Sequence, residues 1–321
     1  LAEQVKQKLP EERTRSAKAD WIGQGECEKR LGLTEWNKFL AYETMLGRLA
    51  GPPYTKQISN PETRRAHRES MAALRAAAGE VGAEKTREIY QEAISSHPKD
   101  HYRHQSYAEY LEMSGDLNGA IEEWQTIQTL VPHHPLAYFH AGRLWVRQGE
   151  FKKAQTELER GLAIRSDLPE ALLELGKALA GGDQHEAAQA RFKEVLEMEP
   201  GNAAAHFQMA ESLAAQDQRA AAMEHLRAAV AANPGHWQAH YYLGVELALQ
   251  QKIDEAAHHF SQVVRLKPDH ALAHFNYGVA LAQQRRFAEA RIQFAETLKL
   301  EPDHTGAQKH LGTLNEVLRQ K

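Results

Sequence analysis

A 34-residue period runs through most of this chain and limits its fold more than any other feature. Proline recurs at that interval from position 98 to position 302, with a single interruption filled by serine. The series reads Pro98, Pro132, Ser166, Pro200, Pro234, Pro268 and Pro302. Between successive members, apolar residues recur at helical spacing in two stretches separated by a polar break. Each unit therefore predicts a helical hairpin, and the chain an all-α array of stacked hairpins.

Small and large side chains keep fixed places within each unit. Alanine fills one place in the second helix of every unit: Ala120, Ala154, Ala188, Ala222, Ala256 and Ala290. A large apolar residue follows four positions later: Trp124, Leu158, Phe192, Leu226, Phe260 and Phe294. A place in the first helix is again small: Ala108, Gly142, Gly176, Ala210, Gly244 and Gly278. We expect the two helices of a hairpin to approach most closely at the alanine.

These small and large positions resemble those of the tetratricopeptide repeat family. The resemblance implies an α-solenoid that winds as a right-handed superhelix. We divide the chain into a helical adaptor or linker at 1–60, a degenerate first repeat at 61–100, six repeats, and a capping helix at 305–321. The six repeats occupy 101–134, 135–168, 169–202, 203–236, 237–270 and 271–304. The capping helix becomes polar, so we expect the chain to end at its natural C-terminus.

A second resemblance concerns the N-terminal part of the chain. The stretch from Trp21 through Leu49 to PPYTKQ is similar to the segment that joins a bacterial SGNH (GDSL-type) hydrolase domain to a following tetratricopeptide array. The serine block and closing Asp-x-x-His of such a hydrolase have no counterpart here and would lie upstream of Leu1. The chain begins without a targeting leader, which indicates a piece of a longer protein and leaves its compartment open.

Composition and the lack of catalytic motifs argue against several classes of function. Lys and Arg number 39 against 43 Asp and Glu, a net charge of -4 that argues against a nucleic-acid surface. The sequence holds no apolar run of about 20 residues that could span a bilayer. There is no phosphate-binding glycine loop or serine elbow, and the single cysteine, Cys27, has no evident base beside it. We expect a chain without catalytic activity and without a cofactor.

The 18 histidines could suggest a metal site. His206, His240 and His274 occupy the same place in three consecutive repeats. Equivalent places in stacked repeats are about 8 to 10 Å apart, which is too far for one metal ion to bridge. We therefore interpret these histidines as packing residues and predict no metal site.

The tetratricopeptide resemblance implies a concave groove lined by the first helix of each repeat. Its fifth place is mostly aromatic or aliphatic, and its ninth place changes from charged to apolar toward the C-terminus. The predicted groove consists of Phe139, Arg143, Arg147, Leu173, Lys177, Phe207, Tyr241, Val245, Phe275 and Val279. A curved apolar surface of this kind suits an extended peptide or an amphipathic helix. Arg143, Arg147 and Lys177 form a basic spot that could hold an acidic group of the ligand.

The sequence thus favours a non-catalytic scaffold that binds a protein or peptide in its groove. The carboxylate clamp that some family members use for chaperone tails is not matched, because its lysine and asparagine places hold Phe139 with Arg143 and Leu173 with Lys177. Two alternatives remain open. The chain could be the C-terminal recruiting arm of an SGNH-type hydrolase, or a structural module that self-assembles into a homo-oligomer.

Overall fold

The computed structural model describes residues 83–319, which form fourteen α-helices and no strand. This confirms the predicted all-α solenoid class. The predicted adaptor at 1–60 and the start of the degenerate repeat lie outside the described residues. The chain divides into two compact units, Leu1–Leu136 and Ala137–Lys321. Within the described part, no helix is both long enough and apolar enough to cross a membrane.

The described part of the first unit contains three complete helices: α6 (Ala83–Ser96), α7 (His101–Met113) and α8 (Leu117–Leu130). Tyr90 of α6 stacks on Tyr107 and Tyr110 of α7, with ring centroids 5.4 Å apart in both pairs. Helices α7 and α8 pack together as a hairpin around the buried Trp124. Aromatic contacts thus join α6 to α7.

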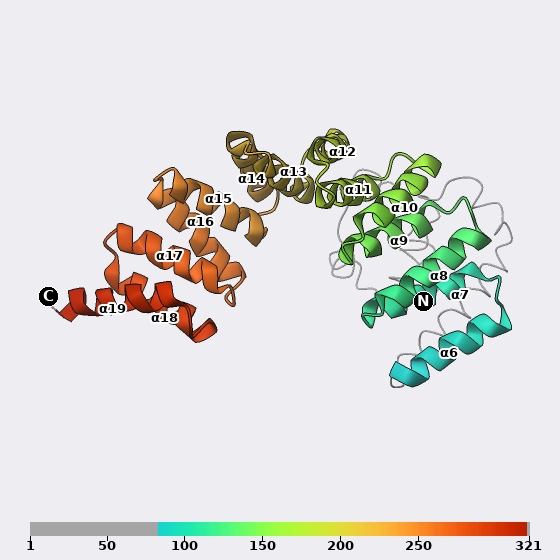
Figure 1. Cartoon of the computed structure of the whole chain (residues 1–321), viewed down its shortest axis with the longest axis horizontal. Helices are drawn as coiled ribbons and strands as arrows, with labels where there is room; N and C mark the ends of the chain where they lie inside the picture. The colour runs from blue at the N-terminus through green and yellow to red at the C-terminus, as the bar shows by residue number, and fades with distance from the viewer. Residues whose placement is uncertain (1–82, 320–321) are drawn as a thin grey trace, which may run out of the picture. The chain divides into compact units, whose positions relative to one another are not determined.

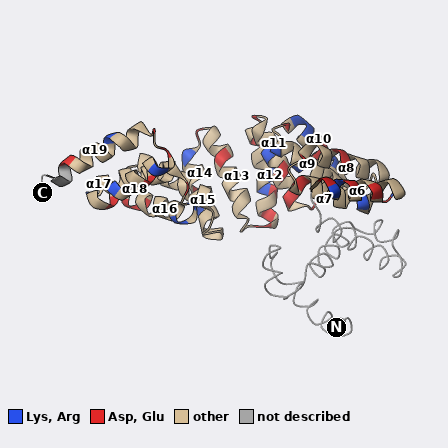
Figure 2. Cartoon of the chain, turned by 90° about the horizontal axis from the view of Figure 1, so that it is seen from below, with Lys and Arg blue, Asp and Glu red and all other residues tan. Residues whose placement is uncertain are grey.

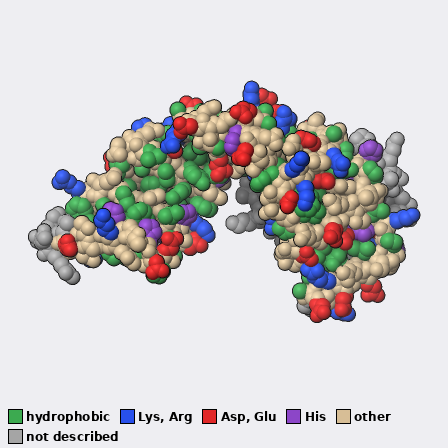
Figure 3. Space-filling view, viewed as in Figure 1, with side chains coloured by type: hydrophobic (Ala, Val, Ile, Leu, Met, Phe, Trp, Pro, Cys, Tyr) green, Lys and Arg blue, Asp and Glu red, His purple; other side chains and the backbone are tan. Residues whose placement is uncertain are grey.

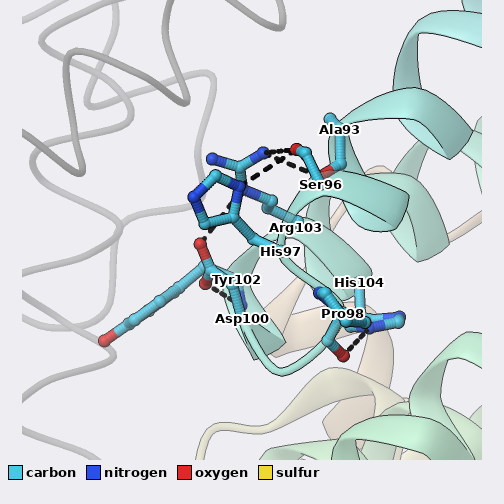
Figure 4. Close-up of polar contacts among 8 residues, drawn as sticks. All are labelled: Ala93, Ser96, His97, Pro98, Asp100, Tyr102, Arg103 and His104. Atoms are coloured by element: carbon cyan, nitrogen blue, oxygen red, sulfur yellow. Dashed lines mark hydrogen bonds and ion pairs between the residues drawn. The ribbon is translucent and has the colours of Figure 1, made fainter.

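Arg103 fastens the turn between α6 and α7 (Figure 4). Its Nη1 donates hydrogen bonds to the carbonyl of Ala93 at 2.7 Å and to Oγ of Ser96 at 3.1 Å. Its Nε donates to Asp100 Oδ2 at 3.2 Å, while Oδ1 of the same carboxylate caps α7 by accepting from the Tyr102 amide. One guanidinium therefore joins a carbonyl and a hydroxyl in the last turn of α6 to the N-cap residue of α7.

The second unit begins within α9 and continues as a series of antiparallel hairpins (Figure 1). Its helices are α9 (Pro135–Arg147), α10 (Phe151–Ile164), α11 (Pro169–Gly181), α12 (His185–Met198), α13 (Ala203–Ala215), α14 (Arg219–Ala232), α15 (Trp237–Leu249), α16 (Ile253–Leu266), α17 (Ala271–Gln283), α18 (Phe287–Leu300) and α19 (Thr305–Arg319). From α11 to α18, first helices have 13 residues and second helices 14. From α10 onward, each helix contacts the next one along the chain.

The turn between the two helices of each hairpin contains one residue in the left-handed conformation. Glycine supplies it in the first two hairpins, where φ is 85° at Gly115 and 76° at Gly149. Residues with side chains take the same conformation in the next four: Asp183, Asp217, Gln251 and Arg285, with φ between 58° and 61°. The left-handed turn is therefore a fixed property of the repeat, and four hairpins adopt it without glycine.

The small and large places of the repeat meet inside each hairpin. A methyl group added at Gly244 would lie 2.8 Å from the Phe260 ring, and one added at Gly278 equally close to Phe294. At Gly176 the added methyl would overlap the Phe192 ring. The first helix thus lies directly against the large side chain of the second, which only a residue without a Cβ permits at this distance.

Candidate binding face

The first helices of successive hairpins in the second unit lie beside one another. Helix α11 contacts α13, and α15 contacts α17. The Asn276 amide in α17 donates a hydrogen bond of 3.3 Å to the Tyr241 hydroxyl in α15, and the rings of Phe207 in α13 and Tyr242 in α15 are 5.9 Å apart. The first helices therefore form a continuous layer on which residues from several repeats can meet one ligand.

The aromatic residues at the fifth place of the first helix pack between repeats. Three of them pack at a tilted angle against the histidine that caps the next first helix: Phe207 against His236, Tyr241 against His270 and Phe275 against His304, with centroids 4.7, 5.0 and 4.5 Å apart. These histidines also cap their helices, because Nδ1 of each accepts a hydrogen bond from a backbone amide three residues later. The three rings thus hold neighbouring repeats together.

Phe207 was predicted to line the groove, but its side chain is buried. Only 7% of its surface is exposed, whereas Tyr241 and Phe275 are half-buried. The 34-residue pattern placed Phe207 on the first helix correctly. It could not show that His236, at the end of the same repeat, and Tyr242 of the next repeat would cover the ring.

Adjacent first helices α15 and α17 together carry three exposed large apolar side chains. Tyr242 is 45% exposed, Leu249 61% and Leu272 47%. Tyr242, Val245 and Leu249 follow at i, i+3 and i+7 and so share one side of α15, and Leu272 and Val279 share the same side of α17. We call these five residues the apolar face. Figure 3 shows hydrophobic side chains gathered over this part of the second unit.

The predicted basic spot is partly neutralised by acidic neighbours. Lys177 Nζ pairs with Glu174 at 2.8 Å within α11. The Arg143 guanidinium lies 5.9 Å from the centre of the Phe139 ring, and its Nη2 is 3.4 Å from Nδ1 of His140. Arg147 is exposed. Charges of both signs are interspersed along the helices (Figure 2), so these cations do not form a uniformly positive surface.

Helix α13 separates the charged first helices from the apolar ones. Its Glu211 corresponds in register to Lys177 in α11 and to Val245 in α15. Although its side chain keeps contact with solvent, the surrounding protein desolvates the carboxylate and raises its pKa, despite a 2.8 Å hydrogen bond from Gln208. Leu173 of α11 is half-buried against Leu172 and Val195. The side chains on this layer therefore change along the chain, from charged and ion-paired ones on α11 to exposed apolar ones on α15 and α17.

Comparison with known proteins agrees with this arrangement. Two sequence profiles, both of tetratricopeptide repeats, match residues 178–243 and 246–305. These two stretches are tetratricopeptide repeats. No curated protein matches it.

Solved structures place these tetratricopeptide repeats among known helical arrays. PilF of Pseudomonas aeruginosa superposes with a TM-score of 0.60 at 14% identity, over 66% of this chain and 97% of that one. The Cut9–Hcn1 hetero-tetramer of APC/C gives 0.57 at 15% identity, over 75% of this chain and 48% of that one. The C-terminal part of a tetratricopeptide protein from Cytophaga hutchinsonii gives 0.52 at 16% identity, over 66% and 85%. Likeness at these identities shows the fold alone. The hydrolase resemblance, which falls outside the described residues, stays a prediction.

The histidines at the fourth place of the first helix share one hydrogen bond. Nε2 of each lies near the carbonyl of the proline six residues earlier, at 3.0 to 3.3 Å: His104 with Pro98, His206 with Pro200, His240 with Pro234 and His274 with Pro268. Gln308 of α19 makes the same contact with the Pro302 carbonyl at 2.9 Å. A carbonyl only accepts, so Nε2 carries the hydrogen. These side chains fasten the turn between repeats, which supports the packing interpretation.

The other ring nitrogen of each of these histidines contacts a residue 19 positions later in the second helix. His104 Nδ1 is 2.6 Å from Glu123, His206 and His240 are each 2.9 Å from Nδ1 of a second histidine, and His274 is 2.8 Å from Gln293. The histidine partners are His225 and His259. Sequence inspection missed both, because only the packed hairpin reveals an offset of 19.

Neighbouring groups and burial shift the pKa of four histidines at these contacts: His104, His225, His240 and His259. Hydrogen bonding to the Glu123 carboxylate raises the pKa of His104. Burial and the neighbouring imidazole lower the pKa of His225, and burial lowers that of His240. Burial, together with His240 and other nearby cations, lowers the pKa of His259 to about 4. His225, His240 and His259 are therefore neutral near pH 7.

Proposed function

We propose that the second unit binds an amphipathic segment of another protein on its apolar face, without a catalytic step. The observation that carries this proposal is the exposure of Tyr242, Leu249 and Leu272 on adjacent first helices. Contiguous apolar side chains left in water usually mark an interaction site. The repeat architecture supports a protein-binding role, since its stacked first helices offer an extended surface rather than an enclosed pocket.

The chemistry of the layer indicates the kind of partner. The only charged side chain of α15 and α17 is Glu246, which is mostly buried and lies 3.9 Å from Arg219, so the contacting side of the partner should be aliphatic or aromatic. Toward α13 and α11 the same layer offers Glu211 and the Lys177–Glu174 pair. Polar or charged groups of the partner should lie over that end. An amphipathic helix or extended segment can meet both requirements, because its side chains alternate in character.

A peptide selection tests this proposal directly. We would display random peptides on phage, select against the full chain, and measure the affinity of the enriched peptides by fluorescence anisotropy. The tested variant carries Leu249→Gln and Leu272→Gln, which remove apolar surface without opening a core. The matched control is Ile292→Gln, an exposed apolar residue on the second helix α18.

We expect peptides rich in apolar residues whose affinity falls at least about tenfold in the double variant, because roughly 1.4 kcal/mol corresponds to a tenfold change. The control should bind them like the wild type. Failure to enrich any peptide, or equal affinity for all three proteins, would contradict the proposal. Self-association, the structural alternative, would appear as a sedimentation mass that rises with concentration and falls in the double variant.

A further inference from the structure

We propose that His206 and His225 form a chelating pair for one divalent transition-metal ion, such as Ni²⁺ or Cu²⁺, between α13 and α14. This site is separate from the apolar face and does not depend on the proposed function. Among the described residues, no group of three or more histidine, cysteine or acidic side chains could hold a metal ion. The proposed site therefore has two protein ligands, and water completes the coordination.

The separation of the two nitrogens fits a shared metal ion. Nδ1 of His206 and Nδ1 of His225 are 2.9 Å apart. Imidazole nitrogens bind such metals at about 2.0 to 2.1 Å, so two of them at a right angle around one ion lie about 2.9 Å from each other. Right angles are the preference of tetragonal Cu²⁺ and Ni²⁺ complexes. The folded hairpin thus already holds the nitrogens at the required spacing.

The second nitrogen of His206 orients the ring as in many metal-binding histidines. Its Nε2 donates to the Pro200 carbonyl at 3.1 Å, which leaves a lone pair on Nδ1. A hydrogen bond from the distal nitrogen to a carbonyl is the usual outer contact of a ligating histidine. His225 Nδ1 now donates to that lone pair. On metal binding, the proton on His225 Nδ1 is replaced by one on its Nε2, which leaves both Nδ1 atoms available to bind the ion.

Charge distinguishes this pair from the similar pair formed by His240 and His259. Glu224 lies close enough to His225 to stabilise a positive charge there. His240, in contrast, is only 4% exposed, and Arg265 acts on it while Arg227 acts on its partner. His258 adds a further imidazole beside both. We therefore expect the first pair to bind a cation more tightly than the second, although both have a nitrogen separation of 2.9 Å.

The chain itself supplies conservative variants for a test. Gln293 takes the place of the second histidine opposite His274 and keeps a 2.8 Å contact with its Nδ1. Gln308 takes the place of the first histidine and keeps the contact with the proline carbonyl. His225→Gln and His206→Gln should therefore preserve the hairpin and remove one ligand each. His259→Gln makes the same change in the other pair and is the matched control.

The experiment is calorimetric titration of Ni²⁺ into the untagged full chain near neutral pH, with Mg²⁺ as a hard-cation control. Loss of even an outer contact typically weakens a metal site about tenfold or more, so His225→Gln and His206→Gln should each weaken the tightest Ni²⁺ binding at least about tenfold. His259→Gln should leave it unchanged, and Mg²⁺ should not compete.

Circular dichroism would establish that each variant is folded, and two independent ligand variants keep the test valid if one is not. Isotherms unchanged by both ligand variants would overturn the proposal, because the metal would then bind other histidines. An equal loss in His259→Gln would overturn it as well, since the two pairs could not then be distinguished.

Discussion

At the scale of single residues, the histidines at the fourth place of the first helix share one hydrogen bond and differ in the partner of their second ring nitrogen. His104, His206, His240 and His274 all fasten a proline carbonyl, and each then meets a different partner in the second helix. The period alone indicated that these histidines are structural. It could not indicate their protonation, because that depends on whether the partner is a carboxylate, an amide or another imidazole.

The lowered pKa of His259 predicts acid sensitivity of the second unit. A histidine whose folded pKa lies near 4, against 6.5 for the free side chain, contributes stability that is present above about pH 6.5 and is lost as the pH falls toward 4. The wild-type melting temperature should therefore decrease between pH 7 and pH 5. His259→Gln should decrease less over the same range, and an identical slope would show that this pair does not set the sensitivity.

The contribution of His104 to stability should have the opposite pH dependence. Its pKa is raised by Glu123, so its contribution is present below about pH 6.5 and is lost as the pH rises through the raised value. Glu123→Gln should therefore lower the melting temperature more at pH 6 than at pH 9. Thermal scans at the two pH values measure this difference, and an equal effect at both would argue against a charged pair.

Close packing at Gly176 leads to a third residue-level prediction. A methyl there overlaps the Phe192 ring, so Gly176→Ala should lower the free energy of unfolding by about 1 to 3 kcal/mol. Gly312→Ala is the control, because nothing lies within 4 Å of the added methyl and alanine favours the helix by about 1 kcal/mol. Urea unfolding compares the two. A neutral Gly176→Ala would mean that the phenyl ring can move aside freely.

At the scale of elements, the sequence predicted the hairpins well because the signal is repeated. Each break between helices coincides with a polar stretch or proline, and each close approach with alanine or glycine. Contacts between neighbouring repeats were harder to predict. Phe207 has groove register but is covered by His236, and Leu272 lies open although the predicted groove did not include it. Such contacts depend on how one hairpin rotates over the next, which the pattern within a repeat does not specify.

The turn between helices gives a prediction for an element. Gln251 adopts φ of 61°, where residues with a Cβ pay a steric penalty and glycine does not. Gln251→Gly should therefore raise the free energy of unfolding by about 1 kcal/mol, the lower end of the strain expected for such a conformation. Gly149→Gln, at the same place in another turn, should lower it. Equal stability of both variants and wild type in urea would show that the turn tolerates side chains.

At the scale of the whole molecule, α19 shields the apolar surface of the hairpin formed by α17 and α18 from water. Ala307 and Leu314 of α19 complete the cluster around Phe294 and Leu281, with Phe275 packed against it. Removal of residues 305–321 should expose this apolar surface. We expect the truncated chain to melt at a lower temperature and to bind a hydrophobic dye, as followed by calorimetry and fluorescence. Unchanged melting would show that the last hairpin is stable without α19.

The central claim is that the apolar face of α15 and α17 holds a segment of another protein. Amide hydrogen exchange, measured by mass spectrometry with and without a selected peptide, tests it most directly because it locates the bound segment on the chain. The account predicts slower exchange in α15 and α17, with little change in the second helices α16 and α18. Protection confined to α16 and α18, or spread evenly over the second unit, would contradict it.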